Sequence, residues 1–277
     1  MLRQRIITGL IMAGLFLSSI AFLPVGALAG LFAVLIALGA WEWARLAGWQ
    51  SVPGRSIFVL VALGSVAAAY FHSQLINGPQ RELVQPYIGL ACLWWSIALL
   101  WIRGYPGSAV LWRNRAMRSL MGLLILVPAW LAAVYLLSLP RGGVLVVVMV
   151  LIVVVADVGA YFAGRQFGKH KLAEMVSPAK TWEGFWGGVL CSSLLAVVLW
   201  YVLPDRYDVG LAAIIAVCVT TGLASVVGDL SVSMVKRESG VKDSGSLLPG
   251  HGGILDRLDS ICGAAPVFTL GLMLGGW

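Results

Sequence analysis

The sequence predicts an all-α, polytopic integral membrane protein with about nine transmembrane helices. Hydrophobic residues make up 60% of the 277 positions and charged residues only 11%, and the mean hydropathy is +0.93. Such a composition lies far outside that of soluble globular domains. The apolar runs are also continuous rather than alternating, which is typical of helices that cross a bilayer core of about 30 Å and not of barrel strands.

The N-terminal half contains the first five expected spans, and proline, glycine or charge separates each from the next. They are Ile6–Leu23, Val25–Leu46, Ser56–Phe71, Pro86–Ile102 and Ser119–Leu139. Pro24 divides the first two runs, and the segment around Pro53 divides the second from the third. Because the first run is longer than the roughly 7 to 15 apolar residues of a signal peptide, we expect a membrane helix there rather than a cleaved leader.

The C-terminal half contains the remaining expected spans, and two of its connections are long and polar. These spans are Gly142–Gly164, Gly184–Leu203, Val209–Val235 and Leu258–Gly276. We expect one integral membrane domain over residues 1–277. Within it, residues 1–140 would form N-terminal helices for scaffold, dimer or lipid contacts, and residues 141–277 would form the catalytic helices and cytoplasmic loops.

The distribution of cations predicts the orientation of the chain. If the N-terminus is cytoplasmic and the spans alternate, all of the 19 lysines and arginines except Arg81, Arg141 and Arg206 fall on the cytoplasmic side. This bias follows the positive-inside rule and indicates a multi-pass protein of the plasma (inner) membrane with its C-terminus outside. Segments 165–183 and 236–256 then become cytoplasmic loops. The net charge of +7 reflects this topology, so we expect no nucleic-acid partner.

Four acidic residues occupy the cytoplasmic ends of expected spans: Asp157, Asp229, Asp256 and Asp259. An ionised side chain inside a bilayer costs at least about 3 kcal/mol, so acids at a shared depth indicate a site. Carboxylates that converge at one depth are natural ligands for a hard cation such as Mg²⁺. The alternative is that they pair with nearby cations, or that Asp256 caps the last helix.

The segment after the eighth span combines cations with glycines. Lys236, Arg237 and Lys242 lie near Gly252, Gly253 and three further glycines, whose backbone N–H groups can approach an anion closely. Metal-binding acids beside phosphate-binding cations indicate nucleotide chemistry. Taken alone, a Lys-Arg pair after a span is usually a topology determinant.

The other cytoplasmic segment offers a second set of polar side chains. Asp157, Tyr161 and Arg165 are four residues apart and share a helical face. Ser177, Lys180 and Thr181 are expected in a turn set by Pro178, where they could hold a phosphate or a base. The glycine pattern of a P-loop is missing. The alternative is a basic amphipathic loop that lies on anionic headgroups.

His251 could serve as a general base. A phosphate nucleophile, however, is already ionised near neutral pH and needs no proton removed. A histidine flanked by glycines would then contact phosphate or fix the loop.

These residues resemble the signature of the phosphatidate cytidylyltransferases, also called CDP-diacylglycerol synthases. The resemblance covers the C-terminal half of the chain. Its downstream residues are Ser233, Lys236, Arg237, Lys242, Asp243, Gly245, Leu248, Pro249, His251, Gly252, Gly253, Asp256, Arg257, Leu258 and Asp259. Its upstream residues are Asp157, Tyr161, Gly164, Phe167, Gly168 and the run from Ser177 to Gly184.

The resemblance implies transfer of CMP from CTP to phosphatidic acid, with Mg²⁺ as cofactor and a monovalent ion such as K⁺ beside it. It also implies a homodimer among membrane lipids. Carried over, the metal ligands are Asp229 and Asp256, supported by Asp259, with Asp157 a further candidate. The candidate catalytic residues are Lys236, Arg237, Lys242, Asp243 and His251. The candidate substrate-binding residues are Ser233, Ser177, Lys180, Thr181, Tyr161, Arg165, Gly252, Gly253 and Arg257.

The physical setting agrees with this reaction, because a bilayer lipid and a cytosolic nucleotide can meet only at the interface. Two rival functions remain at this point. An ion-coupled transporter would place its acids near the bilayer midplane, between broken helices. A polytopic lipid kinase that uses CTP would share the metal logic but release CDP instead of pyrophosphate.

Overall fold

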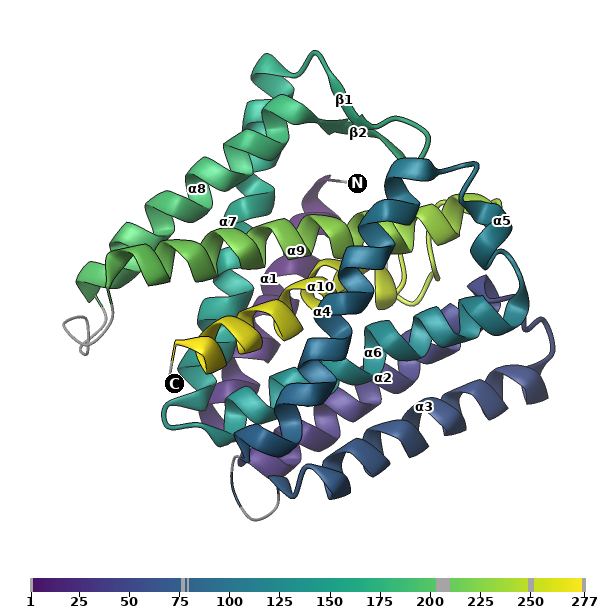
Figure 1. Ribbon diagram of the computed structural model, residues 1–277, viewed down its shortest axis with the longest axis horizontal. Coiled ribbons are helices and arrows are strands. Elements are labelled where there is room, and N and C mark those ends of the chain that lie inside the picture. The colour runs from purple at the N-terminus through teal and green to yellow at the C-terminus, as the bar shows by residue number, and fades with distance from the viewer. Residues whose placement is uncertain (1, 76–77, 79, 203–209, 249–251, 276–277) are drawn as a thin grey trace. The chain divides into compact units, whose positions relative to one another are not determined.

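The computed structural model describes residues 2–75, 78, 80–202, 210–248 and 252–275, and this part of the chain is almost entirely helical (Figure 1). The all-α class is thereby confirmed. The helices are α1 (Leu2–Phe22), α2 (Val25–Leu46), α3 (Val52–His72), α4 (Arg81–Gly104), α5 (Ala109–Trp112), α6 (Arg115–Ser138), α7 (Gly142–Phe167), α8 (Trp182–Val202), α9 (Leu211–Glu238) and α10 (Leu255–Leu274). Two short strands, β1 (Lys171–Ala173) and β2 (Ser177–Thr181), lie between α7 and α8.

Eight helices within the described ranges are long and apolar enough to cross a membrane, namely α2, α3, α4, α6, α7, α8, α9 and α10. The protein is therefore a multi-pass membrane protein. The first expected span corresponds to α1, in which the described apolar segment, Ile7–Phe22, is shorter than the other eight.

Several helices extend beyond the apolar runs that predicted them. Helix α9 continues past Val235 to Glu238, so Lys236 and Arg237 lie in its last turn and not in a loop as expected. Helix α10 begins at Leu255, which places Asp256 in its first turn. The physical reason is that cations are favourable at the C-terminus of a helix and acids at its N-terminus.

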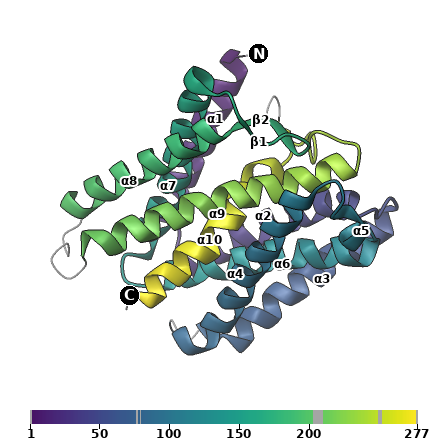
Figure 2. The same cartoon turned by 45° about the horizontal axis from the view of Figure 1, so that its top comes forward.

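The turn expected around Pro178 is wrong, because Ser177–Thr181 is strand β2. It pairs with β1 as an antiparallel hairpin, with Lys171 opposite Thr181 and Ala173 opposite Ser177. Pro178 is tolerated because each strand of a two-stranded sheet is an edge strand. The hairpin joins the adjacent ends of α7 and α8 (Figure 2).

The chain forms two compact units. The first unit comprises Met1–Val84, Leu111–Val147 and Val235–Asp259, and the second comprises Gln85–Val110, Val148–Met234 and Ser260–Trp277. The chain passes from the second unit to the first within α9 and returns within α10.

In the first unit, α2, α3 and α6 lie side by side (Figure 1). The fully buried Trp43 of α2 packs against Gly122 of α6, where a Cβ would collide with the indole ring. The indole Nε1 donates to the carbonyl of Arg118 at 2.7 Å. Asn114 accepts from the amide of Met117 at 2.8 Å and so caps α6.

The end of α9 is held within the first unit by a small polar cluster. Arg118 Nη1 donates to the carbonyl of Leu46 at 3.0 Å and to Ser239 Oγ at 3.2 Å. Ser239 Oγ donates in turn to the Leu46 carbonyl at 3.0 Å. The loop that follows α9 therefore starts from a fixed point beside α2 and α6.

In the second unit, glycines allow α7 and α8 to approach closely. A Cβ at Gly159 would collide with Cys191, and one at Gly187 would collide with Ala163. Gly164 and Gly184 pack against one another near the hairpin. Close packing of small residues is a common way for membrane helices to associate, and here it brings together the ends of α7 and α8 that the β1–β2 hairpin connects.

Candidate active site

A cavity of about 390 Å³ lies in the second unit. Its wall is formed by α7, the hairpin, the start of α8 and α9. The lining residues are Asp157, Ala160, Tyr161, Gly164, Arg165, Leu172, Ala179, Lys180, Thr181, Gly184, Phe185, Val226 and Asp229. The cavity thus collects six of the candidate site residues from three separate stretches of the sequence.

An ion pair crosses this cavity from β2 to α9. Lys180 Nζ lies 2.7 Å from Asp229 Oδ2, and both side chains are partly exposed. The other carboxylate oxygen of Asp229 accepts from Ser233 Oγ at 3.0 Å, one helical turn later. A lysine and a carboxylate that face the same partly open space can bind a phosphate and a metal ion, respectively.

The face of α7 that was expected to carry polar side chains does line the cavity. Asp157, Tyr161 and Arg165 are all in its wall. Arg165 Nη1 donates to the Tyr161 hydroxyl at 3.3 Å, so the guanidinium is held at the cavity with donors left for an anion.

Thr181 and Ser177, both expected to contact substrate, lie at opposite ends of β2, and only Thr181 is in the cavity wall. Thr181 is 7% exposed, and its Oγ1 accepts from the amide of Gly184 at 3.1 Å, which is the capping bond of α8. Ser177 lies at the far end of β2, opposite Ala173, and is not in the cavity wall.

We expect Thr181→Val to lower the free energy of unfolding by about 1 kcal/mol, because the shape is nearly retained while the capping bond is lost. Thermal unfolding of purified protein measures this. Thr220→Val is the matched control, since the Thr220 hydroxyl donates to Ala216 within its own helix and caps no helix end. Equal midpoints for the two variants would contradict the capping role.

Glu183 is a structural residue that the sequence analysis did not assign. Its carboxylate accepts from the amides of Lys169 and His170 at 3.1 and 3.2 Å, and it lies 2.6 Å from His170 Nδ1. It therefore fastens the segment before β1 to the start of α8. An acidic residue in the first turn of a helix beside a basic loop was the signal available in the sequence.

The first unit contains a second group of predicted residues around a buried ion pair. Lys236 Nζ lies 2.7 Å from Asp256 Oδ1, and the two side chains are only 8% and 5% exposed. Asp256 Oδ2 accepts from the amides of Ser244 and Gly253, each at 2.9 Å. One carboxylate thus joins the last turn of α9, the loop and the first turn of α10.

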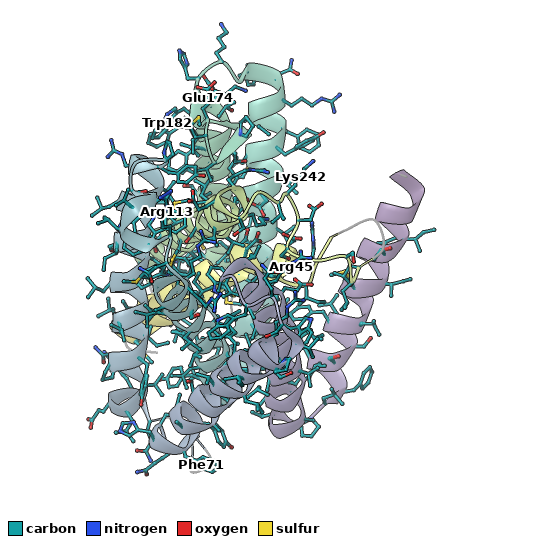
Figure 3. All side chains as sticks on the ribbon, turned by 90° about the vertical axis from the view of Figure 1, so that its right-hand side faces the viewer. Arg45, Phe71, Arg113, Glu174, Trp182 and Lys242 are labelled. Atoms are coloured by element: carbon teal, nitrogen blue, oxygen red, sulfur yellow. The ribbon has the colours of Figure 1, made fainter. Side chains whose placement is uncertain are left out.

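The loop between these helices carries several other candidates. Lys242 and Asp243 are exposed, and Figure 3 shows Lys242 and Arg45 of α2 beside this loop. Arg45 donates to the carbonyls of Asp243 and Ser244. Gly252 has a positive φ of 81°, which favours glycine, and its carbonyl accepts from the Leu248 amide at 2.9 Å.

The remaining candidates vary in exposure. Arg257 is exposed on the first turn of α10, Arg237 is half-buried, and Asp259 is buried at 6%. His251 lies outside the described residues. The structure therefore brings Asp157, Lys180 and Asp229 together in one unit, and Lys236, Asp256 and the loop together in the other.

The residues present fit a divalent cation at the first of these places. Within the described ranges, the protein does not gather three or more His, Cys, Asp or Glu side chains into one cluster. Mg²⁺ does not need such a cage, because it is commonly held by one or two carboxylates together with water and substrate phosphates. Asp157 and Asp229 supply two carboxylates to one cavity, and a metal ion there would take the place of Lys180 Nζ at Asp229 Oδ2.

A family model described as the cytidylyltransferase family matches residues 3–274 of the chain. The chain belongs to the cytidylyltransferase family. As a family member, it is a nucleotidyltransferase, and the cations and acids described above are the kind of groups that this chemistry uses.

Two phosphatidate cytidylyltransferases are similar over nearly the full chain, and a third is similar over less than half of it. A phosphatidate cytidylyltransferase of Pseudomonas aeruginosa is 43% identical over 278 residues, which cover 100% of this chain and 99% of the relative. One of Haemophilus influenzae is 37% identical and covers 97% of this chain and 98% of its own length. One of Staphylococcus epidermidis is 46% identical over 120 residues, or 43% of this chain and 45% of the relative.

Proposed function

We propose that this cytidylyltransferase transfers CMP from CTP to phosphatidic acid and forms CDP-diacylglycerol and pyrophosphate. Full-length similarity to phosphatidate cytidylyltransferases supports this substrate. The structural observation that carries the proposal is the cavity in which Lys180 of β2 meets Asp157 and Asp229, which lie in the C-terminal halves of the apolar helices α7 and α9. A lipid phosphate and a nucleotide can both reach such a position.

In the proposed reaction, a phosphate oxygen of phosphatidic acid forms a bond to the α-phosphorus of CTP. The bond from that phosphorus to the oxygen bridging to the β-phosphate breaks, and pyrophosphate leaves. Two like unit charges about 5 Å apart repel by about 3 kcal/mol at an effective dielectric constant near 20. The main task of the protein is therefore to neutralise and position phosphates.

The cations have distinct roles in this proposal. Lys180 and Arg165 are assigned to phosphate binding in the second unit, and Lys242 and Arg237 to nucleotide binding in the first. Lys236 holds Asp256, and Ser233 holds Asp229. Gly252 and Gly253 are assigned to phosphate binding, which for Gly253 requires its amide to leave Asp256 Oδ2. Tyr161 in the second unit, and Asp243 and Arg257 in the first, are assigned to substrate contacts. His251 contacts phosphate and removes no proton.

We assign Mg²⁺ to Asp157 and Asp229, and K⁺ as the second ion. When bound, the divalent ion supplies positive charge to the phosphate oxygens and to the departing pyrophosphate. Asp256 and Asp259 remain proposed ligand and supporting acid, respectively. For Asp256 this requires Lys236 to release Oδ1, which an incoming triphosphate would favour by attracting the ammonium.

The proposal extends to the setting of the enzyme. The distribution of lysines and arginines supports an inner-membrane protein with a cytoplasmic N-terminus, cytoplasmic site loops and an external C-terminus. We also propose a homodimer, and we assign residues 1–140 to scaffold, dimer or lipid contacts and residues 141–277 to catalysis.

Purified protein supplied with CTP, phosphatidic acid and Mg²⁺ is expected to release pyrophosphate and form a CMP-lipid in equal amounts. Mass spectrometry of the lipid and a coupled pyrophosphate assay measure the two products. Omission of phosphatidic acid is the control and should give neither. Release of CDP with a phosphorylated lipid would identify a CTP-dependent kinase instead and would contradict the proposal.

A further inference from the structure

Glu42 lies in α2 and has a buried carboxylate. This carboxylate accepts hydrogen bonds from the segment that connects α9 to α10 and from the start of α10. Its Oε2 accepts from Ser244 Oγ at 2.7 Å and from the Leu255 amide at 2.9 Å. Its Oε1 accepts from the Ile254 amide at 3.0 Å. Glu42 is only 7% exposed, and a buried carboxylate is costly unless it is hydrogen-bonded in this way.

The donors to Glu42 are neighbours of the donors to Asp256. Ser244 gives its hydroxyl to Glu42 and its amide to Asp256. On the returning side of the loop, Gly253 gives its amide to Asp256, while the next two amides go to Glu42. These two amides stand at the N-terminus of α10, where backbone N–H groups have no partner within the helix. The two carboxylates therefore hold both ends of the loop together.

The Glu42 carboxylate lies against two glycines of the loop, Gly245 and Gly253, at the positions where a Cβ would stand. A Cβ at Gly245 would collide with its Oε1 and Cδ, and a Cβ at Gly253 would collide with its Oε2. Neither glycine has the positive φ that would explain its presence by backbone conformation. Close approach of the Glu42 carboxylate is thus the physical reason for glycine at these positions.

We infer that Glu42 is a positioning residue for cytidylyl transfer, which holds the nucleotide-binding loop and the first turn of α10 in their working arrangement. The inference rests on the proposed function. Both carboxylate oxygens accept protein donors, so Glu42 acts through Ser244 and the amides of α10 and not on substrate. Arg45, one turn later on α2, assists by binding the carbonyls of Asp243 and Ser244.

The first test compares Glu42→Gln, Glu42→Asp and Glu42→Ala in full-length protein, with the exposed Glu82→Gln of the same unit as control. Glu42→Gln replaces an acceptor oxygen by a donor group. Loss of one hydrogen bond to a charged group corresponds to a change of about 10- to 100-fold in an equilibrium or rate constant. We expect kcat/KM for CTP to fall by that factor and KM for phosphatidic acid to change much less. Glu42→Asp should recover part of the loss.

The second test is independent of turnover and measures amide hydrogen exchange. In Glu42→Ala, peptides that contain Ser244, Ile254 and Leu255 should exchange faster, while those of the β1–β2 hairpin should not change. Unchanged exchange in the loop would overturn the inference. Faster exchange with wild-type kcat/KM would also overturn it, because Glu42 would then be structural only. A wild-type protein without cytidylyl transfer would instead defeat the proposed function.

A loss of activity in a single variant could come from misfolding. Comparing Gly245→Ala in two backgrounds, with and without the Glu42 side chain, separates misfolding from the proposed contact. Gly245→Ala should strongly lower kcat/KM for CTP in the otherwise wild-type protein, because the added Cβ would collide with the Glu42 side chain. In the Glu42→Ala background the same change should add little, since that side chain is gone. Gly30→Ala on α2, where a Cβ meets nothing within 4 Å, is the matched control. Equal effects of Gly245→Ala in both backgrounds would overturn the inference.

Discussion

Asp229→Asn is expected to lower kcat/KM by about 100-fold or more while the protein remains folded. The substitution keeps the size of the side chain but removes the charge that faces Lys180 at 2.7 Å. It also removes one of the two carboxylates assigned to Mg²⁺. The rate should be measured as a function of Mg²⁺ concentration, because loss of a metal ligand raises the concentration that gives half-maximal rate.

Two companions sharpen this measurement. Asp157→Asn should show the same shift in Mg²⁺ dependence, since Asp157 lines the same cavity. Glu174→Gln neutralises a carboxylate that is exposed in the turn of the hairpin and outside the cavity wall (Figure 3), and it should leave the rate unchanged. Near-normal turnover in Asp229→Asn would remove Asp229 from the site.

Lys236→Met is expected to be both inactive and destabilised. It leaves the Asp256 carboxylate buried without its cation, and removal of one partner of a buried pair costs about 3 to 5 kcal/mol. Asp256→Asn should also be inactive and destabilised, because it leaves the Lys236 ammonium buried without its carboxylate. Thermal unfolding in detergent and cytidylyl transfer are the two measurements.

The double variant Lys236→Met with Asp256→Asn separates stability from chemistry. Because no unpaired charge is left, its unfolding midpoint should lie above those of both single variants. Activity should remain lost, since the ammonium and the carboxylate are both absent. Recovery of turnover in the double variant would show that the pair serves stability alone. Lys169→Met, at an exposed position, is the control for loss of a lysine.

The membrane spans could be predicted from the sequence because a run of about 20 apolar residues has few alternatives to a transmembrane helix. The same argument predicted Asp157 and Asp229 at the ends of spans. The structure brings both into one cavity, but α7 continues beyond Asp157 to Phe167 and α9 continues beyond Asp229 to Glu238. The hairpin could not be predicted in this way. Strands of three and five residues are too short to show a period of two, and Pro178 resembled a turn residue.

Contacts between segments that are distant in the chain could not be predicted from the sequence for a different reason. Lys236 and Asp256 are 20 residues apart, and no local pattern shows that the loop returns to join them. Glu42 lies between two tryptophans in an apolar run, where it was passed over among the N-terminal helices. A single acid inside a membrane span is nevertheless a functional signal in itself, because its charge is expensive there.

For the position of Lys180, the length of the turn between β1 and β2 matters more than the identity of the residues in that turn. Lys180 reaches the cavity because Lys171 pairs with Thr181 and Ala173 with Ser177. The ladder is irregular between these two pairs, and a change of register would move Lys180 from its position 2.7 Å from Asp229. An insertion or deletion between Ala173 and Ser177 could therefore remove the cavity's ammonium while every chemical group of the site remained in the sequence.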